Sequence, residues 1–525
     1  MVQIISVAAL CLFTVLMVAT GIYGSKKVSG SMDGFLLGGR NIGPWMSAFS
    51  YGTSYFSAVI FVGYAGTHGW NIGIGSIWIG IGNAILGCLL AWLALAKPTR
   101  RMTHRLGVKT MPEFFEARFS SKSMKIYAAV IIFIFLVPYA ASVYKGLGSL
   151  FGAVFPNVSD YFFGLSPDIV CMFIVALLTA VYLVLGGYMA TAVTDFIQGI
   201  IMIVGVFIMV IAITNHPNVG GIANLFTKLK LVDASLVDPF GGSNWKFLLV
   251  NILLTSFGTW GLPQMVHKFY AIKDEASIRH ATVVSTVFAL IIGCGAYFVG
   301  TMGRFFVPAA ADGTPVGGFD AVIPSLLMQA FSNGIFFNIL LSIVLLLVLS
   351  ASMSTLSSLV LSSSSAVSVD LVGAYKKDMK PKSQVALTRV LCFLFVALSF
   401  LFASFNFAII VSIMSFSWGV VSGCFIGPFL WGLHSRKVTK AGAWCGLVSG
   451  LLVVLLMLAY DMAVFRNSLS VTGAQGIYSA FQLASQNAPI YGVVAMAVSV
   501  VIVPLVSLFT KKPGKEQVAR CFGND

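Results

Sequence analysis

A run of hydroxyl side chains between Ser350 and Ser368 is the stretch of this chain best suited to chemistry. It contains ten serines and Thr355. The run follows the apolar segment Asn338–Val348 directly, so the two together predict one long membrane helix. The residues with the three- and four-residue spacing of one helical face are Ala351, Ser354, Thr355, Ser358, Ser362 and Ser365. Hydrocarbon offers a hydroxyl nothing to bond. The stripe therefore either packs against neighbouring helices or presents neutral oxygens to a small cation such as Na⁺.

Composition identifies a polytopic membrane protein. The 525 residues are 58% hydrophobic and 9% charged, with a mean hydropathy of +0.95, whereas soluble domains carry about 25% charged residues. The eight cysteines are scattered and form no C-x-x-C pair. This spacing supports neither a disulfide framework nor a zinc site. We find no catalytic constellation and expect no enzymatic activity.

The apolar pattern predicts an all-α protein with about 13 membrane spans. Each segment approaches or exceeds the roughly 20 residues that cross a bilayer. The expected segments are 4–24, 44–69, 72–96, 125–155, 166–187, 190–213, 246–264, 280–306, 330–366, 384–404, 407–432, 440–460 and 488–510.

Basic residues predict the orientation. With the N-terminus outside, the external loops hold only Lys228, Lys230, Lys246, Arg304 and Arg466, while 26 of the 32 basic residues lie on the other side. This asymmetry favours an external N-terminus and a cytoplasmic C-terminus. The net charge of +15 is then a consequence of topology, with anionic lipid rather than nucleic acid as its neighbour. We expect a multi-pass protein of the cell membrane, and no obligate protein partner is evident.

Two spans are predicted to be broken. Glycines and hydroxyls interrupt the second span around Gly52–Ser57, and Gly258, Gly261 and Pro263 interrupt the seventh. A broken helix frees backbone carbonyls, which are tolerated at membrane depth only where they line a cavity or bind an ion. Spans two to six and seven to eleven form two sets of five that each begin with a broken member. This pattern is the sequence signature of an inverted-repeat transporter.

Asp195 and Lys145 are charged residues well inside predicted spans. Asp195, near the start of the sixth span, is the one acid well inside a span, and such a residue marks a functional site unless a salt bridge or a helix cap explains it. Lys145 lies in the fourth span. The alternatives are that it pairs with an anionic substrate, that it replaces an ion, or that it has a structural role in which its amine snorkels to the membrane surface or bonds carbonyls.

Several motifs together resemble the sodium:solute symporter family, which includes sodium/proline, sodium/glucose and sialic acid symporters. The matching segments run in order from Phe35 to Gly450. They are FLLGGRNIGPW (Phe35–Trp45), the broken second span, MPEFFEARF (Met111–Phe119), VYLVLGGYMATAVTDFIQG (Val181–Gly199), the serine stretch and GPFLWGLHSRKVTKAGAWCGLVSG (Gly427–Gly450). The resemblance implies a LeuT-type inverted repeat of five plus five helices. It divides the chain into a leading helix and loop (1–43), a first repeat (44–213), an external loop (214–245), a second repeat (246–433) and two further helices with a short tail (434–525).

The resemblance also implies sodium sites. By position, the main site takes the backbone carbonyls of Thr53, Phe56 and Ala351 and the hydroxyls of Ser354 and Thr355. Some members of the family have a second site, whose positions here are Asp195, Ser354, Ser357 and Ser358. All four of these residues bear oxygen, so a second Na⁺ is chemically feasible.

For the substrate, the resemblance implies a small organic solute carried with Na⁺. The candidate pocket residues are Ser57, Tyr139, Thr255, Thr259, Trp260 and Lys145. Tyr55 and Val59 replace an Asp and a Trp of the proline carriers, which argues against proline itself. The segment GTWGLPQMVHKFY (Gly258–Tyr270) resembles acetate and other monocarboxylate carriers. Amino acids, monocarboxylates and, as an alternative, sugars or polyols remain open. A channel or a transporter-derived sensor is the rival from another class.

Overall fold

The computed structural model describes residues 2–27, 31–162, 164–331, 334–376, 379–405, 407–468 and 473–523. Within these ranges the chain forms helices and loops, with two isolated β-bridges and no strands. The helices of eight residues or more are α1 (Val2–Lys27), α3 (Pro44–Tyr55), α4 (Ala65–Ile72), α6 (Lys97–Leu106), α7 (Met111–Phe119), α8 (Lys122–Val154), α9 (Pro167–Thr214), α10 (Ile222–Val232), α11 (Trp245–Gly261), α12 (Pro263–Tyr270), α13 (Glu275–Thr301), α14 (Val322–Ala330), α15 (Ile335–Ser365), α17 (Pro381–Ser404), α18 (Ile410–His434), α19 (Lys440–Ser468), α20 (Gly473–Ser485), α21 (Ala488–Phe509) and α22 (Lys515–Phe522).

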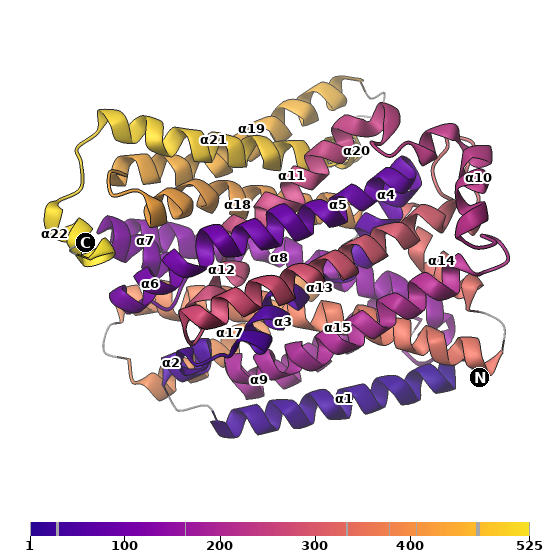
Figure 1. Ribbon diagram of the computed structural model, residues 1–525, viewed down its shortest axis with the longest axis horizontal. Coiled ribbons are helices and arrows are strands. Elements are labelled where there is room, and N and C mark those ends of the chain that lie inside the picture. The colour runs from indigo at the N-terminus through magenta and orange to yellow at the C-terminus, as the bar shows by residue number, and fades with distance from the viewer. Residues whose placement is uncertain are drawn as a thin grey trace.

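The long helices run roughly parallel to one another as a single bundle, with the N-terminus marked at one end and the C-terminus at the other (Figure 1). Among the described residues, ten helices are long and apolar enough to cross a membrane. One of these stretches, Val59–Leu106, covers parts of two expected spans, and Pro167–Val181 is a shorter apolar helix. A multi-pass helical membrane protein is thereby confirmed, whereas the count of 13 spans and the orientation stay predictions. The domain boundaries also stay predictions, and those at residues 1 and 525 lie outside the described ranges.

Both predicted helix breaks are present. Helix α3 ends at Tyr55, Phe56 is extended (φ −104°, ψ 135°), and helical structure resumes as η2 at Val59–Tyr64. Helix α11 ends at Gly261, Leu262 is extended (φ −77°, ψ 122°), and α12 begins at Pro263. Each break leaves carbonyl and N–H groups without partners in their own helix, so neighbouring side chains must satisfy them.

A third break divides α9 into two segments. Gly187 has φ 58° and ψ −168°, in a region that residues with a Cβ rarely adopt. A Cβ at this position would also lie 2.9 Å from the ring of Phe35. The glycine therefore allows the chain to leave one membrane segment and begin the next, which carries Asp195, without an intervening loop.

The serine-rich helix α15 lies in the interior of the bundle. It continues through η11 (Ala366–Val372), so the predicted single long helix is confirmed over Ile335–Tyr375. It packs against α9, α8, α1, α17 and the broken α3. Of the hydroxyl stripe, Ser354 and Thr355 are fully buried, and Ser358 and Ser365 are 6% and 3% exposed, so these residues lie against protein rather than lipid.

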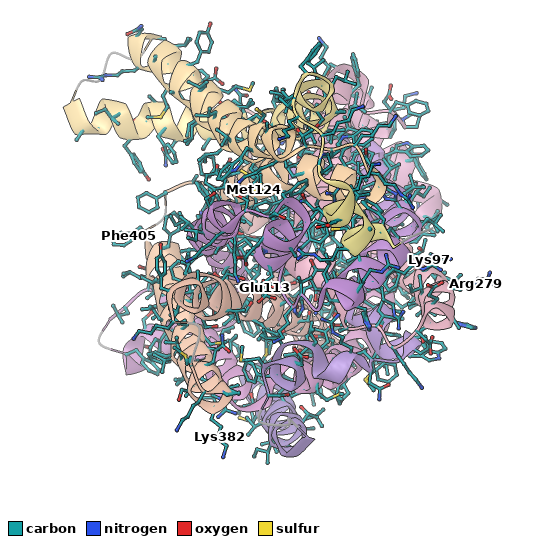
Figure 2. All side chains as sticks on the ribbon, turned by 90° about the vertical axis from the view of Figure 1, so that its left-hand side faces the viewer. Lys97, Glu113, Met124, Arg279, Lys382 and Phe405 are labelled. Carbon is teal, nitrogen blue, oxygen red and sulfur yellow. The ribbon has the colours of Figure 1, made fainter. Side chains whose placement is uncertain are left out.

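The end of the bundle that carries α22 bears exposed basic side chains. Figure 2 looks onto this end and shows Lys97, Arg279 and Lys382 at its rim. These three residues belong to the loops that the charge asymmetry assigns to the cytoplasm. Their common position at one end is the arrangement that the predicted orientation requires.

Candidate functional site

The break in α3 faces the hydroxyl stripe of α15. The Thr355 hydroxyl lies 3.1 Å from the Phe56 carbonyl oxygen and 3.2 Å from that of Ser54. The Ser354 hydroxyl lies 2.9 Å from the Thr53 carbonyl oxygen. Both hydroxyls also donate to the Ala351 carbonyl, at 2.9 Å for Ser354 and 3.0 Å for Thr355.

The structure thus brings together all five residues predicted for the main sodium site. Each is less than 1% exposed. The two hydroxyls are placed to donate hydrogen bonds to the freed carbonyls. A cation among these oxygens would take over their lone pairs, and each hydroxyl has the rotational freedom to turn its proton away.

Two serine hydroxyls accept hydrogen bonds from the backbone on the other side of the same break. The Ser352 hydroxyl accepts a hydrogen bond of 2.9 Å from the backbone N–H of Ala58, and the Ser57 hydroxyl accepts one of 3.2 Å from the Val59 N–H. These N–H groups begin the second half of the broken helix, where they lack partners in their own helix. Ser57, a candidate pocket residue, therefore has a capping role here.

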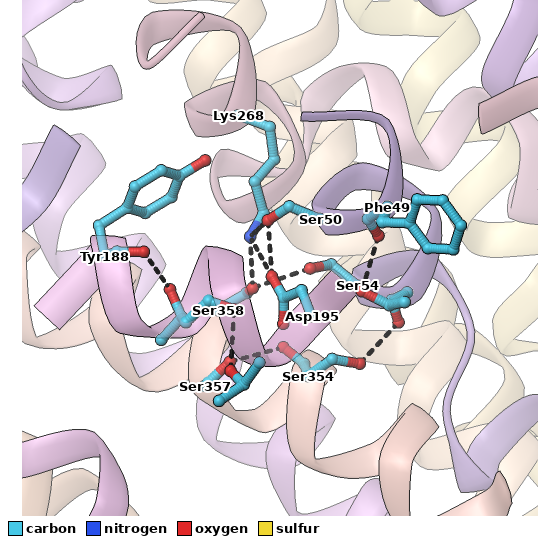
Figure 3. A network of polar contacts seen from close by, with 12 residues as sticks. Phe49, Ser50, Ser54, Tyr188, Asp195, Lys268, Ser354, Ser357 and Ser358 are labelled. Atoms are coloured by element: carbon cyan, nitrogen blue, oxygen red, sulfur yellow. Dashed lines mark hydrogen bonds and ion pairs between the residues drawn. The ribbon is translucent and has the colours of Figure 1, made fainter. Parts of the chain in front are cut away.

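The predicted second site contains a lysine that the sequence analysis did not assign to it. Lys268 on α12 is 2% exposed. Its Nζ lies 2.8 Å from the Ser50 hydroxyl, 2.9 Å from the Ser358 hydroxyl and 3.6 Å from Oδ2 of Asp195 (Figure 3). Asp195 also accepts a hydrogen bond of 2.6 Å from Ser50. The predicted seventh span ends at residue 264, which leaves Lys268 outside the membrane. The signal that could have found it is its place among Val266, His267, Phe269 and Tyr270, directly after the predicted break.

Of the four residues predicted for the second site, two contact this ammonium and two do not. Asp195 and Ser358 lie next to Lys268. The Ser354 hydroxyl is directed toward the Thr53 carbonyl, and the Ser357 hydroxyl donates to the Ser354 carbonyl of its own helix at 2.8 Å. The second sodium site stays a prediction, now with a neighbouring cation that belongs to the protein.

The candidate pocket residues divide into separate groups. The Tyr139 ring packs edge-on against Trp418, with centroids 5.6 Å apart, and Tyr55 stacks on the same indole at 6.4 Å. The Tyr55 hydroxyl donates to the Thr255 carbonyl at 2.7 Å. These contacts join the broken α3, α8, α11 and α18 around one aromatic centre, in which Trp418 and Tyr55 were not among the predicted pocket residues.

Thr255, Thr259 and Trp260 bind the neighbouring η4 (Asn83–Leu89). Thr255 donates to Oδ1 of Asn83 at 2.7 Å, Thr259 donates to the Gly87 carbonyl at 2.9 Å, and Trp260 donates to the Leu86 carbonyl at 3.0 Å. Their polar atoms already have protein partners in this conformation, so a solute would have to compete for them.

Lys145 lies apart from this aromatic centre. Its Nζ is 3.3 Å from Oδ2 of Asp320, with exposed side-chain fractions of 17% and 16%, and it donates to the Ala408 carbonyl. Asp320 in turn accepts from the Ile410 N–H, and the Ser149 hydroxyl donates to the Asp320 carbonyl at 3.0 Å. The ion pair connects α8 to the loop before α14 and to the start of α18, which favours the structural alternative for Lys145.

The chain has relatives among known transporters. The sequence model of the sodium:solute symporter family matches residues 35–450. The chain is 28% identical over 512 residues to the sodium/proline symporter of Staphylococcus aureus (strain JH9), covering 96% of this chain and 93% of that protein. The proteins of the same name from strains USA300 and COL match to the same extent.

Two solved structures share the fold. A Na⁺-coupled sialic acid symporter in a substrate-bound, outward-open state superposes with a TM-score of 0.72 at 17% identity, covering 97% of this chain and 98% of that one. A nucleobase-cation-symport-1 family transporter in a closed conformation gives a TM-score of 0.50 at 13% identity, covering 93% and 97%. At these identities the likeness concerns the fold alone.

The Lys145–Asp320 ion pair predicts non-additive effects on stability. Lys145→Met and Asp320→Asn should each lower the thermal unfolding temperature of the purified protein, because each leaves a largely buried partner charge unpaired. The double variant should lower it no further than the worse single variant, with a coupling of about 0.5–3 kcal/mol. Exposed Lys511→Met is the matched control. Strictly additive losses would contradict the pairing, and selective loss of binding of anionic ligands in Lys145→Met would favour substrate recognition.

Proposed function

The chain belongs to the sodium:solute symporter family, and we propose that it imports a small organic solute together with Na⁺ by alternating access across the cell membrane. Sodium-coupled symport follows from the family. We propose, in addition, which residues bind Na⁺, which class of solute is carried and in which membrane the protein resides.

One observation carries it: five neutral oxygens converge where the broken α3 meets α15. The hydroxyls of Ser354 and Thr355 lie within 2.9–3.1 Å of the carbonyls of Thr53, Phe56 and Ala351. A set without a carboxylate suits a monovalent ion, because Ca²⁺ and Mg²⁺ normally recruit carboxylate ligands. The site joins two helices of different repeats, so binding of Na⁺ would stabilise one arrangement of the repeats relative to the other.

The ion gradient supplies the energy for uptake. Moving one Na⁺ inward across 100 mV provides about 2.3 kcal/mol before any concentration term. At about 1.4 kcal/mol per factor of ten, this supports roughly fifty-fold accumulation of a neutral solute.

The solute class is proposed from the aromatic centre. Tyr139, Trp418 and Tyr55 present ring surfaces, and these suit a small solute with an apolar part. The Staphylococcus aureus relatives are named for proline, whereas Tyr55 stands where the proline carriers have an acid. Amino acids other than proline and monocarboxylates are therefore the preferred classes.

A thermal-shift screen should identify the solute. The purified protein would be heated with amino acids, short carboxylates and sugars, once in NaCl and once in choline chloride. We expect at least one amino acid or monocarboxylate to raise the unfolding temperature in NaCl only, because a ligand that binds the folded state stabilises it by mass action. Stabilisation of the same size in both salts would contradict coupling to Na⁺.

The main site predicts a selective change in sodium dependence. Ser354→Ala or Thr355→Ala removes one of five oxygens, and a hydrogen bond or ligand contact to a charged group contributes about 1.5–3 kcal/mol. The Na⁺ concentration for half-maximal thermal stabilisation should rise about ten- to one-hundred-fold, with the amount of folded protein in the membrane unchanged.

The matched control for these variants is Ser365→Ala. Ser365 lies on the same helix, is 3% exposed, and donates its hydroxyl to the Ser362 carbonyl. Its variant should keep the sodium dependence of the native protein. If the Ser354 and Thr355 variants also kept it, or lost folded protein without a change in sodium affinity, helix packing would be the role of the stripe.

A further inference from the structure

The predicted second cation position has a cation of its own. Lys268 approaches it from α12, Ser50 from α3, Asp195 from α9 and Ser358 from α15. The ammonium contacts all three of these residues, at 2.8 Å, 2.9 Å and 3.6 Å for Ser50, Ser358 and Asp195. Figure 3 shows the side chains converging on Nζ from separate helices.

The surroundings of Nζ match those that a monovalent cation requires. Two hydroxyl oxygens and one carboxylate face it, and all three side chains are 6% exposed or less. A buried carboxylate needs a compensating positive charge. The ammonium supplies one positive charge, as Na⁺ would, together with three donors for these oxygens.

The position adjoins the main sodium site. Ser54 contributes to both: its carbonyl accepts from Thr355 at 3.2 Å, and its hydroxyl lies 2.9 Å from that of Ser358. An Na⁺ placed among the oxygens of Asp195 and Ser358 would meet the ammonium at close range and be repelled by it. The two cations therefore exclude each other at this position.

We infer that Lys268 is a tethered cation that takes the place of a second sodium ion, so that the protein binds one Na⁺ per chain at the Thr355 site. The inference rests on the proposed function for that first ion. Because the ammonium is fixed to α12, it compensates Asp195 in every cycle but is not transported. The residues predicted for a second sodium site are thus present, but the ammonium of Lys268 already balances the negative charge of Asp195.

The test is the number of Na⁺ ions bound per chain. Binding of ²²Na⁺ to the purified full-length protein should saturate at one ion. Lys268→Met keeps an unbranched stem of similar volume but removes the charge, which leaves Asp195 with Ser50, Ser54 and Ser358 as oxygen donors. This variant should bind two ions. It should remain folded in NaCl and lose folded protein when choline chloride replaces NaCl. The double variant Asp195→Asn/Lys268→Met has neither charge and should return to one.

Each outcome decides a different question. A folded Lys268→Met that gains no ion overturns the inference, as does a native protein that binds two ions with one of them lost in Asp195→Asn/Lys268→Met. Failure to recover Lys268→Met in either salt also overturns it, because Na⁺ then does not replace the ammonium. A native protein that binds no ion contradicts the proposed main site, as does one whose single ion is bound equally well by Thr355→Ala. The gain of one ion in Lys268→Met is read independently of both results.

Discussion

The backbone carbonyls released at the break of α3 are the constraint on which the site depends. A carbonyl without a partner costs several kcal/mol at membrane depth, and those of Thr53, Ser54 and Phe56 lie inside the protein. On helix α15, the hydroxyls of Ser354 and Thr355 lie within hydrogen-bond distance of all three, and each can donate its one proton to them. These contacts hold the oxygens of the predicted main sodium site close together. Under the proposed function, an ion bound here would replace these hydrogen bonds and stabilise the contact between α3 and α15.

Buried charges impose the second constraint. Asp195 is compensated by Lys268, Asp320 by Lys145, and the buried Asp370 by Lys125, whose Nζ lies 3.7 Å away. Each pair joins segments far apart in the sequence. A buried charge is costly unless an opposite charge lies close to it in the folded chain. Only the first of these pairs adjoins the proposed sodium site. The role proposed for Lys268 depends on that proximity, whereas the other two pairs connect separate parts of the bundle.

Much of the fold could be predicted from the sequence. Hydrophobic length predicts membrane helices, and glycine, proline and hydroxyl residues predict the breaks at Phe56 and Leu262, because these signals are local. The spacing of Ser354 and Thr355 on one helical face likewise follows from helix geometry. That these residues meet Thr53 and Phe56 followed from resemblance to a family rather than from spacing.

Contacts between distant segments could not be predicted in this way. Lys268 lies only four residues after Gln264, but hydropathy places it beyond the end of a span. Its burial depends on α12 continuing into the bundle after the break. The pairing of Lys145 with Asp320 likewise depends on a loop folding back over α8. The stacking of Tyr55 on Trp418 depends on how α3 and α18 are placed in the bundle. No local pattern encodes these distances.

Uptake into proteoliposomes tests the central claim most directly. Purified protein would be reconstituted, and labelled alanine, acetate and myo-inositol would be offered with an inward Na⁺ gradient or with equal Na⁺ on both sides. The account predicts that at least one solute accumulates above its external concentration under the gradient and only equilibrates without it. Accumulation or equilibration that is indifferent to the Na⁺ gradient, for every solute transported, would contradict sodium-coupled symport by this chain.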